Sequence, residues 1–288
     1  LGPEIDATFA RTERPFGVNL ITMHPDLDAL IDVCAARRVG HVVLAGGLPR
    51  SAAIARIKDS GAKVICFAPA LAMARKLVRI GVDAIVIEGM EAGGHIGPVA
   101  TSVLAQEILP EIHEVPVFVA GGIGRGEAIA SYLEMGASGC QLGTRFVCAT
   151  ESIAHPAFKK AVIRAKARDA QISVQLDPKF PVIPVRALAN KATQRFTEFQ
   201  REVIDRHRAG EFDLQAAQLE IELFWVGALR RAVIDGDVES GSVMAGQSVG
   251  LVTKEQSTAE IIAELRQQAA TALAPRATSK SETAGTAI

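Results

Sequence analysis

Two kinds of apolar pattern alternate along the first half of the chain. Short runs rich in β-branched residues predict buried strands, and longer segments with helical apolar spacing predict helices. Strands are expected at 15–22, 41–47, 63–69, 84–87, 115–124 with its glycine loop, and 139–146. Helices are expected between them at 26–38, 50–60, 71–80, 101–112 and 127–135. Such alternation over short loops predicts parallel strands with right-handed crossovers.

Two architectures fit this alternation: a closed (β/α)8 barrel and an open doubly wound sheet. In a barrel, all strands end at one mouth, where the last two loops commonly bind phosphate. The glycine loops at 120–124 (A-G-G-I-G) and 143–146 (G-T-R-F) follow the last two predicted strands. A dinucleotide-binding sheet needs its glycine fingerprint after the first strand. We therefore expect an α/β fold of the TIM barrel type, with strands three to eight visible.

The pattern changes after residue 150, where helix formers, charge and scattered prolines replace the strands. The predicted organisation is a barrel domain at 1–150, a mainly helical cap or substrate domain at 151–234, a closing loop and last barrel helix at 235–272, and a disordered tail at 273–288. Helices are expected within these parts at 215–234 and 258–268. Because the chain begins with Leu1 rather than Met, the two remaining barrel strands are expected upstream of it.

The stretch E-G-M-E-A-G-G-H-I-G at 88–97 follows the central predicted strand. Glycine costs backbone entropy and adds nothing to a core. We therefore interpret the stretch as a loop that admits a flat, bulky ligand close to the main chain and holds His95 beside it. A tight turn with a surface histidine is the alternative. Glu88 and Glu91 could tune the protonation of His95, although a solvated loop acid is the favoured explanation of Glu91.

The two later glycine loops are candidates for phosphate binding. Consecutive main-chain N–H groups form a concave site for anions. Gly121-Gly122 in one loop and Gly143-Thr144 in the other place such groups at adjacent strand ends, and Thr144 adds a hydroxyl donor. The alternative is that both loops are simply tight turns between a strand and a helix.

Three further polar or flexible residues are candidate ligand contacts. Asn19 is expected at the end of the first strand, where it could bond a ring edge or form a strand-end turn. Met244 and Gln247 lie in G-S-V-M-A-G-Q, which is either a loop before a helix or a segment that folds back over the mouth.

The composition narrows the class of protein. The chain has 288 residues, of which 49% are hydrophobic and 22% charged, and a formal net charge of −1. A nucleic-acid or anionic-membrane surface needs a basic excess, and no apolar run approaches the roughly 18 residues that span a bilayer. The four cysteines lack C-x-x-C spacing, which favours reduced thiols in a cytoplasm. No metal site is expected, because the histidines are scattered.

Four motifs together resemble the flavin-dependent nitronate monooxygenase (2-nitropropane dioxygenase) family. They are E-G-M-E-A-G-G-H-I-G, V-A-G-G-I, Q-L-G-T-R-F and G-S-V-M-A-G-Q-S-V-G, in this order. The flavin-dependent enoyl-acyl-carrier-protein reductases share this fold and these motifs. The resemblance covers about residues 15–268. It implies a barrel with a helical cap and one FMN at the carboxyl-terminal mouth.

The resemblance also implies site residues. His95 would be the catalytic residue, beside the flavin ring. The residues expected to bind the cofactor are Asn19, Glu88, Gly94, Ala120, Gly121, Gly122, Gly143, Thr144, Met244 and Gln247. The family's G-P-M-type or G-G-M-type turn after the first strand does not occur in this sequence.

Three functions follow as hypotheses. The first is a nitronate monooxygenase that oxidises alkyl nitronates with oxygen to a carbonyl compound and nitrite. A-G-G-L-P at 45–49 is closer to this branch. The second is an NAD(P)H-dependent enoyl-thioester reductase, to which the segments 151–159 and 236–247 are closer. The third is a barrel that binds a phosphorylated ligand without redox chemistry. A homodimer is compatible with the resemblance, and neither a nucleic acid nor a membrane is an expected partner.

Overall fold

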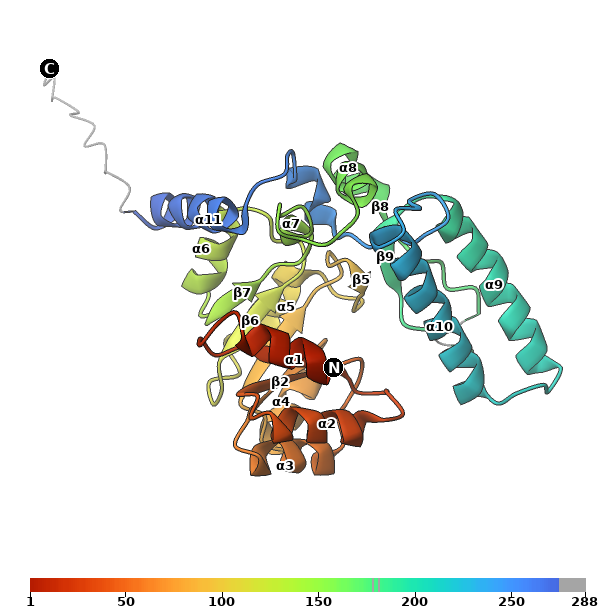
Figure 1. The fold of residues 1–288 in the computed structure, drawn as a ribbon, viewed down its shortest axis with the longest axis horizontal. Coiled ribbons are helices and arrows are strands. Elements are labelled where there is room, and N and C mark those ends of the chain that lie inside the picture. The colour runs from red at the N-terminus through yellow and green to blue at the C-terminus, as the bar shows by residue number, and fades with distance from the viewer. Residues whose placement is uncertain (178, 181, 275–288) are drawn as a thin grey trace, which may run out of the picture.

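The computed structural model describes residues 1–177, 179–180 and 182–274. A parallel sheet of six strands lies at its centre, in the order β1-β2-β3-β4-β6-β7 (Figure 1). The strands are β1 (Gly17–Ile21), β2 (His41–Ala45), β3 (Lys63–Ala68), β4 (Ala84–Glu88), β6 (Val117–Ala120) and β7 (Gly139–Gln141). All five neighbouring pairs run parallel. The expected α/β fold with a parallel sheet is confirmed.

Six helices pack on one face of the sheet (Figure 1), and all of them except α1, which precedes β1, connect successive strands. They are α1 (Gly2–Phe9), α2 (Leu27–Ala36), α3 (Ser51–Asp59), α4 (Leu71–Arg79), α5 (Thr101–Ile108) and α6 (Gly126–Glu134). Five of these match the predicted helices, and α1 was not predicted from the pattern. It packs against α2 and contributes Ile5 to the core.

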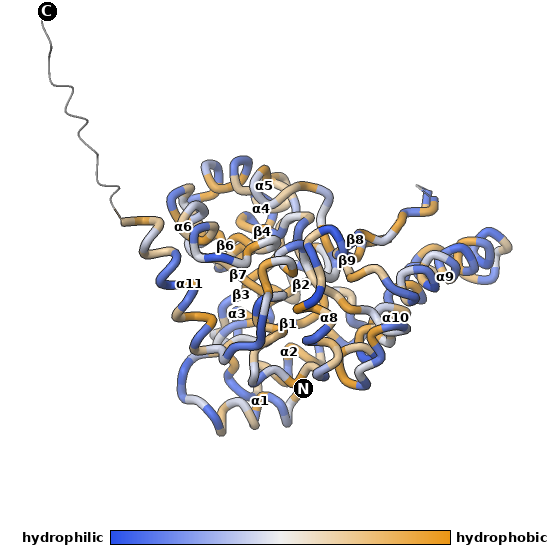
Figure 2. Tube along the Cα trace, turned by 90° about the horizontal axis from the view of Figure 1, so that it is seen from above, coloured by the Kyte–Doolittle hydropathy of each residue, from blue (hydrophilic) through white to orange (hydrophobic). Residues whose placement is uncertain are grey.

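Strand residues alternate between the helix-covered face and the opposite face. Val42, Leu44 and Val64 are buried in the main core together with helix side chains. The intervening Val43 and Ile65 are only partly buried. Figure 2 shows hydrophobic residues along the central strands. Because successive strand side chains point to opposite faces, the sheet has one face sealed by helices and one face that is left more open.

The closed eight-stranded barrel is not confirmed for the described residues. In this part of the chain, β1 pairs with β2 and β7 pairs with β6, and neither pairs with the other. The six strands therefore form an open sheet.

A second, smaller sheet joins the stretch 88–97 to the second half of the chain. Its order is β5-β9-β8, and both pairings are antiparallel. The strands are β5 (Gly94–His95), β8 (Ala170–Ile172) and β9 (Val185–Leu188). The expectation that 151–234 lacks strands is wrong. The strands are short, and β9 contains Arg186, whose burial depends on main-chain carbonyl acceptors at Met90 and Ala170.

The second half of the chain is mostly helical. Its elements are α7 (Thr144–Val147), α8 (Pro156–Arg164), η1 (Ala167–Asp169), α9 (Lys191–Arg208), α10 (Leu214–Val233), η2 (Gln247–Leu251) and α11 (Thr258–Leu273), where η1 and η2 are 3₁₀ helices. Helices α9 and α10 lie side by side at one edge of the molecule (Figure 1). Phe196 packs there against Trp225, with ring centroids 4.2 Å apart.

Two predicted boundaries change. The strand expected at 139–146 ends at Gln141, and α7 begins at Thr144 after Gly143. Helix α11 continues to Leu273 and packs against α6. The predicted disordered tail lies almost wholly outside the described residues, at 275–288.

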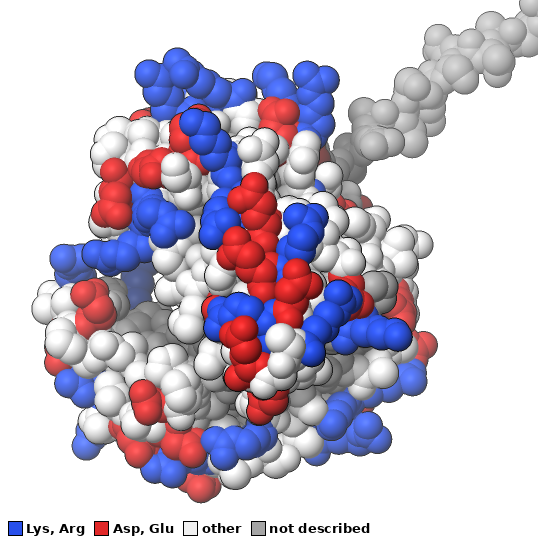
Figure 3. Space-filling view, turned by 90° about the vertical axis from the view of Figure 1, so that its right-hand side faces the viewer, with Lys and Arg blue, Asp and Glu red and all other residues white. Residues whose placement is uncertain are grey.

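Acidic and basic side chains are interleaved on the face shown in Figure 3. On α9, for example, Arg195 pairs with Glu198 and Glu202, whereas Arg206 pairs with Glu211 and Glu220. No helix among residues 1–177, 179–180 and 182–274 is long and apolar enough to cross a membrane.

Candidate functional site

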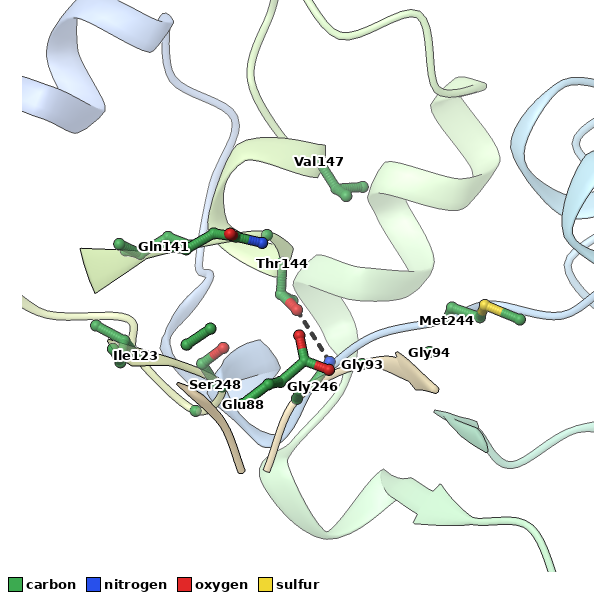
Figure 4. Close-up of a pocket in the computed structure, with 16 residues that line it drawn as sticks. Glu88, Gly93, Gly94, Ile123, Gln141, Thr144, Val147, Met244, Gly246 and Ser248 are labelled. Atoms are coloured by element: carbon green, nitrogen blue, oxygen red, sulfur yellow. Dashed lines mark hydrogen bonds between the residues drawn. The ribbon is translucent and has the colours of Figure 1, made fainter. Parts of the chain in front are cut away.

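The carboxyl ends of β4, β6 and β7 meet at a cavity of about 250 Å³ (Figure 4). This cavity is called the glycine cavity below. Parallel strands direct the loops that follow them to one edge of the sheet. The residues from the predicted cofactor set that line it are Glu88, Gly94, Ala120, Gly121, Gly122, Gly143, Thr144 and Met244. The structure therefore brings together residues that are up to 156 positions apart (88 to 244).

The turn Gly121-Gly122 forms one wall of the glycine cavity. Its φ angles are 96° and 73°, in the left-handed region that L side chains rarely adopt. A Cβ on Gly121 would lie 3.0 Å from the carbonyl oxygen of Gly89. Within the described residues, neither main-chain N–H of this turn donates a hydrogen bond to the protein. Both donors are therefore free for a ligand.

The second glycine loop forms the adjacent wall. A Cβ on Gly143 would meet no atom within 4 Å, so this position leaves space for a ligand. The main-chain N–H groups of Gly143 and Thr144 are likewise unused by the described part of the chain. The Thr144 hydroxyl oxygen accepts a hydrogen bond from the N–H of Gly246 at 2.9 Å (Figure 4). Its hydroxyl hydrogen remains free to donate.

The segment 241–250 folds back over the 88–97 loop. The N–H of Gln247 donates to the carbonyl oxygen of Glu91 at 2.9 Å. A Cβ on Gly93 would come within 2.5 Å of the main chain at Ala245 and Gly246. The two segments therefore touch main chain to main chain, and Met244 reaches the cavity from the second one.

Glu88 ends β4 and directs its carboxyl group into the glycine cavity (Figure 4). Among the described residues, this carboxyl has no hydrogen-bond partner. Burial raises the pKa of Glu88 to about 7, because the charged form loses solvation, and attraction to His95 offsets part of the rise. The cavity therefore favours the protonated form of Glu88 more than water does.

Glu91 does not behave as a solvated loop acid. Its Oε2 accepts hydrogen bonds from both the N–H and the hydroxyl of Thr101, each at 2.7 Å. Thr101 is the first residue of α5 and is buried. The favoured explanation from the sequence is thus corrected: Glu91 fixes the 88–97 loop to the start of α5.

His95 lies next to the glycine cavity, but its side chain does not line it. Its neighbour Gly94 does, whereas the His95 ring is partly exposed. The Nε2 atom of His95 lies 2.8 Å from Oε2 of Glu222 on α10. The convergence of the glycine loops is therefore observed, while the imidazole expected over the ligand is paired at the rim.

Asn19 and Gln247 also lie outside the glycine cavity. Asn19 is in the middle of β1 rather than at its end, and is exposed. Asn19 lies on the same open face of the sheet as Glu88. Across the strands, however, Asn19 pairs with Val43, Val43 with Ile65 and Ile65 with Ala84. Asn19 is therefore level with Ala84, four residues before Glu88. Gln247 lines a second cavity of about 460 Å³, which shares the Gly121-Gly122 turn with the first.

Several cavity residues were not among the candidates. They are Ala92, Gly93, Ile123, Gln141, Leu142, Val147, Gly246 and Ser248. All of them except Val147 lie inside the four motifs, and Val147 directly follows Q-L-G-T-R-F, so taking every motif residue as a candidate would have found all but Val147. Ile123, Leu142 and Val147 add an apolar wall.

The donors and the shape of the cavity fit a phosphorylated flavin. Four free N–H groups at two adjacent loops suit a phosphate. Glycine at 121, 122 and 143 lets a ligand approach the main chain, and the apolar wall suits a planar ring. Residues 121, 122, 143 and 144 would hold the phosphate.

The chain is similar to several known proteins. The nitronate monooxygenase family profile matches residues 27–268. The (3aS,4S,5R,7aS)-5-hydroxy-7a-methyl-1-oxo-octahydro-1H-indene-4-carboxyl-CoA dehydrogenase of Mycobacterium tuberculosis is 29% identical, over 91% of this chain and 80% of that protein. FabK from Thermotoga maritima superposes with a TM-score of 0.82 and 34% identity, covering 94% of this chain and 80% of FabK. Nitroalkane oxidase from Streptomyces ansochromogenes gives 0.74 and 25%, covering 94% and 84%.

Proposed function

Because the chain belongs to the nitronate monooxygenase family and is an oxidoreductase, we propose that it uses FMN to oxidise alkyl nitronates with oxygen. The products are a carbonyl compound and nitrite. The observation that carries the cofactor assignment is the convergence of two glycine loops with four free N–H groups on one cavity. The closure of the sheet into a (β/α)8 barrel and a role of α9 and α10 as a cap belong to the same proposal.

The residues of the glycine cavity have distinct roles in this proposal. The N–H groups of Gly121, Gly122, Gly143 and Thr144 bind the phosphate, and glycine at these positions keeps side chains away from it. Met244 and Gly94 bound the space for the ring. Bound FMN supplies the electron-transfer chemistry, and the protein positions the substrate and handles its proton. His95 serves the reaction from the rim, where its ring is fixed by Glu222.

A second candidate function is the reduction of an enoyl thioester with NAD(P)H. The higher identity and TM-score of FabK, relative to nitroalkane oxidase, favour it. The name of the M. tuberculosis relative also contains a coenzyme A thioester. The glycine cavity serves both reactions, because both need a phosphate cradle and a proton-exchanging group beside a ring.

Anaerobic mixing distinguishes the two functions. The purified yellow protein is mixed separately with NADH and with propyl-2-nitronate, and the flavin absorbance is followed. Bleaching by the nitronate alone supports the monooxygenase. Rapid bleaching by NADH, followed by reoxidation on addition of an enoyl thioester, supports the reductase and contradicts the first proposal.

The cofactor itself is tested by the flavin that the protein retains. Heat-released flavin is separated by chromatography, and the apoprotein is then titrated with FMN and with riboflavin. We expect FMN to be retained and to bind at least about 100-fold more tightly than riboflavin, since charge-assisted bonds to phosphate are lost in riboflavin. Equal affinities would contradict the phosphate role of the glycine loops.

A further inference from the structure

Arg186 is a buried cation in the small sheet β5-β9-β8. It lies on the middle strand β9, paired with Gly94 of β5 on one side and with Ile172 of β8 on the other. The residue is only 3% exposed. Its guanidinium donates to two main-chain carbonyl oxygens, those of Met90 and Ala170. Within residues 1–177, 179–180 and 182–274, no carboxylate forms an ion pair with it.

Packing alone does not explain this cation. Burial lowers the pKa of Arg186, because the charged form loses solvation, and attraction to Glu91 offsets part of the fall. The Glu91 carboxylate is itself bonded to Thr101 rather than to the guanidinium. An apolar side chain of similar volume fills a buried site at least as favourably as an incompletely paired charge. The contribution that only Arg186 makes is therefore its pair of hydrogen bonds.

The bond to Met90 fixes the glycine-rich 88–97 loop near its start. Nε of Arg186 donates to the Met90 carbonyl oxygen at 3.0 Å. The Met90 N–H donates in turn to the carbonyl oxygen of Val99 at 2.8 Å, so both main-chain groups of Met90 are bonded. Met90 lies between Glu88 and Ala92, which line the glycine cavity, whereas Arg186 does not line it. Arg186 therefore holds one wall of the cavity from outside.

Strand β9 also contacts the segment 241–250. Ala187, the residue after Arg186, forms a β-bridge with Met244. The N–H of Leu188 donates to the carbonyl oxygen of Val243 at 2.9 Å. Met244 lines the glycine cavity. Strand β9 therefore holds together two segments that contribute to the cavity, and Arg186 supplies the side-chain part of its connection to the 88–97 loop.

We propose that Arg186 is a positioning residue of the FMN site. Its forked hydrogen bonds fix the backbone of the 88–97 loop against β8 and β9, in the arrangement that binds the cofactor. Arg186 itself touches neither cofactor nor substrate, and it lies 96 positions after the loop residue that it bonds. The inference rests on the proposed function, since it takes the ligand of the glycine cavity to be FMN.

Hydrogen–deuterium exchange of the flavin-free protein tests the fixing of the loop. The wild type, Arg186→Met and Arg186→Lys are compared where all are folded. We expect main-chain exchange in 88–97 to be at least about 10-fold faster in Arg186→Met, with β2 and β3 unchanged, because only a local contact is lost. Arg186→Lys keeps the charge without the rigid fork, so it should behave as Arg186→Met does, and it carries the test should Arg186→Met not fold.

Arg195→Met is the matched control. Arg195 also lies in the second half of the chain, but its side chain is 54% exposed and pairs with Glu198 and Glu202 on the surface of α9. Its replacement should leave exchange in 88–97 at the wild-type rate.

Flavin titration tests the consequence for the site. We expect both Arg186 variants to bind FMN at least about 10-fold more weakly than the wild type, because a wall displaced by about 1 Å is enough for such a loss. Arg195→Met should bind FMN as the wild type does. The visible circular dichroism of FMN bound at saturation should change in the Arg186 variants only, since the ring then lies against a displaced wall.

A purely structural role gives a different result. Arg186 variants that unfold at lower urea but keep wild-type FMN affinity, or whose exchange rises evenly over the whole sheet, overturn the proposal. Wild-type behaviour of Arg186→Lys overturns it as well, because charge rather than the fork would then matter. A wild type that binds no FMN contradicts the proposed function, whereas faster exchange confined to 88–97 in the Arg186 variants would still support the fixing of the loop.

Discussion

The hydroxyl oxygen of Thr144 accepts a hydrogen bond from the main-chain N–H of Gly246 at 2.9 Å. This bond connects the loop after β7 with the segment 241–250, across 102 residues of sequence. Thr144 therefore does two things at once. It faces the glycine cavity, and it holds in place the segment that brings Met244 to the same cavity.

Replacing Thr144 by valine should loosen this segment. Gly246 is buried, so its N–H would lose its acceptor at a cost of about 1–3 kcal/mol. We expect a lower free energy of unfolding by this amount and weaker FMN binding, measured by urea unfolding and by flavin titration. Thr144→Ser keeps the hydroxyl and should retain both. If the valine and serine variants have the same free energy of unfolding and the same FMN affinity, this hydrogen bond does not hold the segment in place.

Gly121→Ala should lower the stability of the fold, whereas Gly143→Ala should weaken FMN binding without a change in stability. Gly121 has φ 96° and lacks space for a Cβ, so Gly121→Ala should destabilise the fold by at least about 1–2 kcal/mol. Gly143 has φ −109° and open space, so Gly143→Ala should leave stability unchanged. Its methyl group enters the cavity, however, and should weaken FMN binding. Thermal unfolding of the apoproteins and flavin titration separate the two effects.

Glu88→Gln should change how stability depends on pH. Burial raises the pKa of Glu88 from 4.5 to about 7 in the folded protein, so folding favours the protonated form. The wild type therefore loses stability as pH rises from about 4.5 through about 7, whereas the glutamine variant does not. We expect the variant to have the higher Tm at pH about 8 and a similar Tm at pH about 4.5. A constant Tm difference across this range would contradict the pKa of Glu88.

We expect Arg145 to stabilise the fold rather than bind the cofactor, although it lies in the G-T-R-F motif. It is only 7% exposed. Its guanidinium donates to the carbonyl oxygen of Leu251 at 3.2 Å, to Gln256 at 2.9 Å and to Glu264 of α11 at 2.8 Å. Lysine cannot make this forked set, so Arg145→Lys should cost about 1–3 kcal/mol in urea unfolding.

The exposed Arg125–Glu127 pair provides the control for this prediction. Arg125→Lys should leave the urea midpoint unchanged within error, because both side chains of this pair are exposed to solvent. Arg145 does not line the glycine cavity, so Arg145→Lys should keep its FMN affinity once folded. Loss of affinity without loss of stability would place Arg145 in the cofactor site instead.

The local pattern was sufficient to predict the parallel sheet. Strands β2 and β3 each combine β-branched residues with a following glycine or proline, and Gly61 and Gly81 end the helices after them with φ of 86° and 89°. These signals lie within a few residues of the feature that they predict. The pairing of β5 with β9 has no such signal, because it joins Gly94 to Arg186.

The glycine walls of the cavity were predictable for the same reason: each follows the end of a parallel strand. The direction of the His95 side chain was not, because it depends on Glu222, whose position follows from the packing of α10. Asn19 was misplaced because it was taken as the last residue of its strand, whereas it lies at the centre of β1 (Gly17–Ile21). The sequence thus predicts which glycine loops follow the strand ends. Which side chains reach the cavity depends on packing between segments that are distant in the sequence.

The contact between Gly93 and Gly246 has a consequence for the order of assembly. Main chain meets main chain there, and the two glycines come from opposite halves of the molecule. Contacts between residues distant in sequence form late and slowly. The segment 241–250 therefore packs over the 88–97 loop only after the sheet has formed. A nascent chain that has not yet emerged past residue 246 would have its strands but no pocket able to retain a cofactor, so cofactor loading must wait until the segment 241–250 is in place.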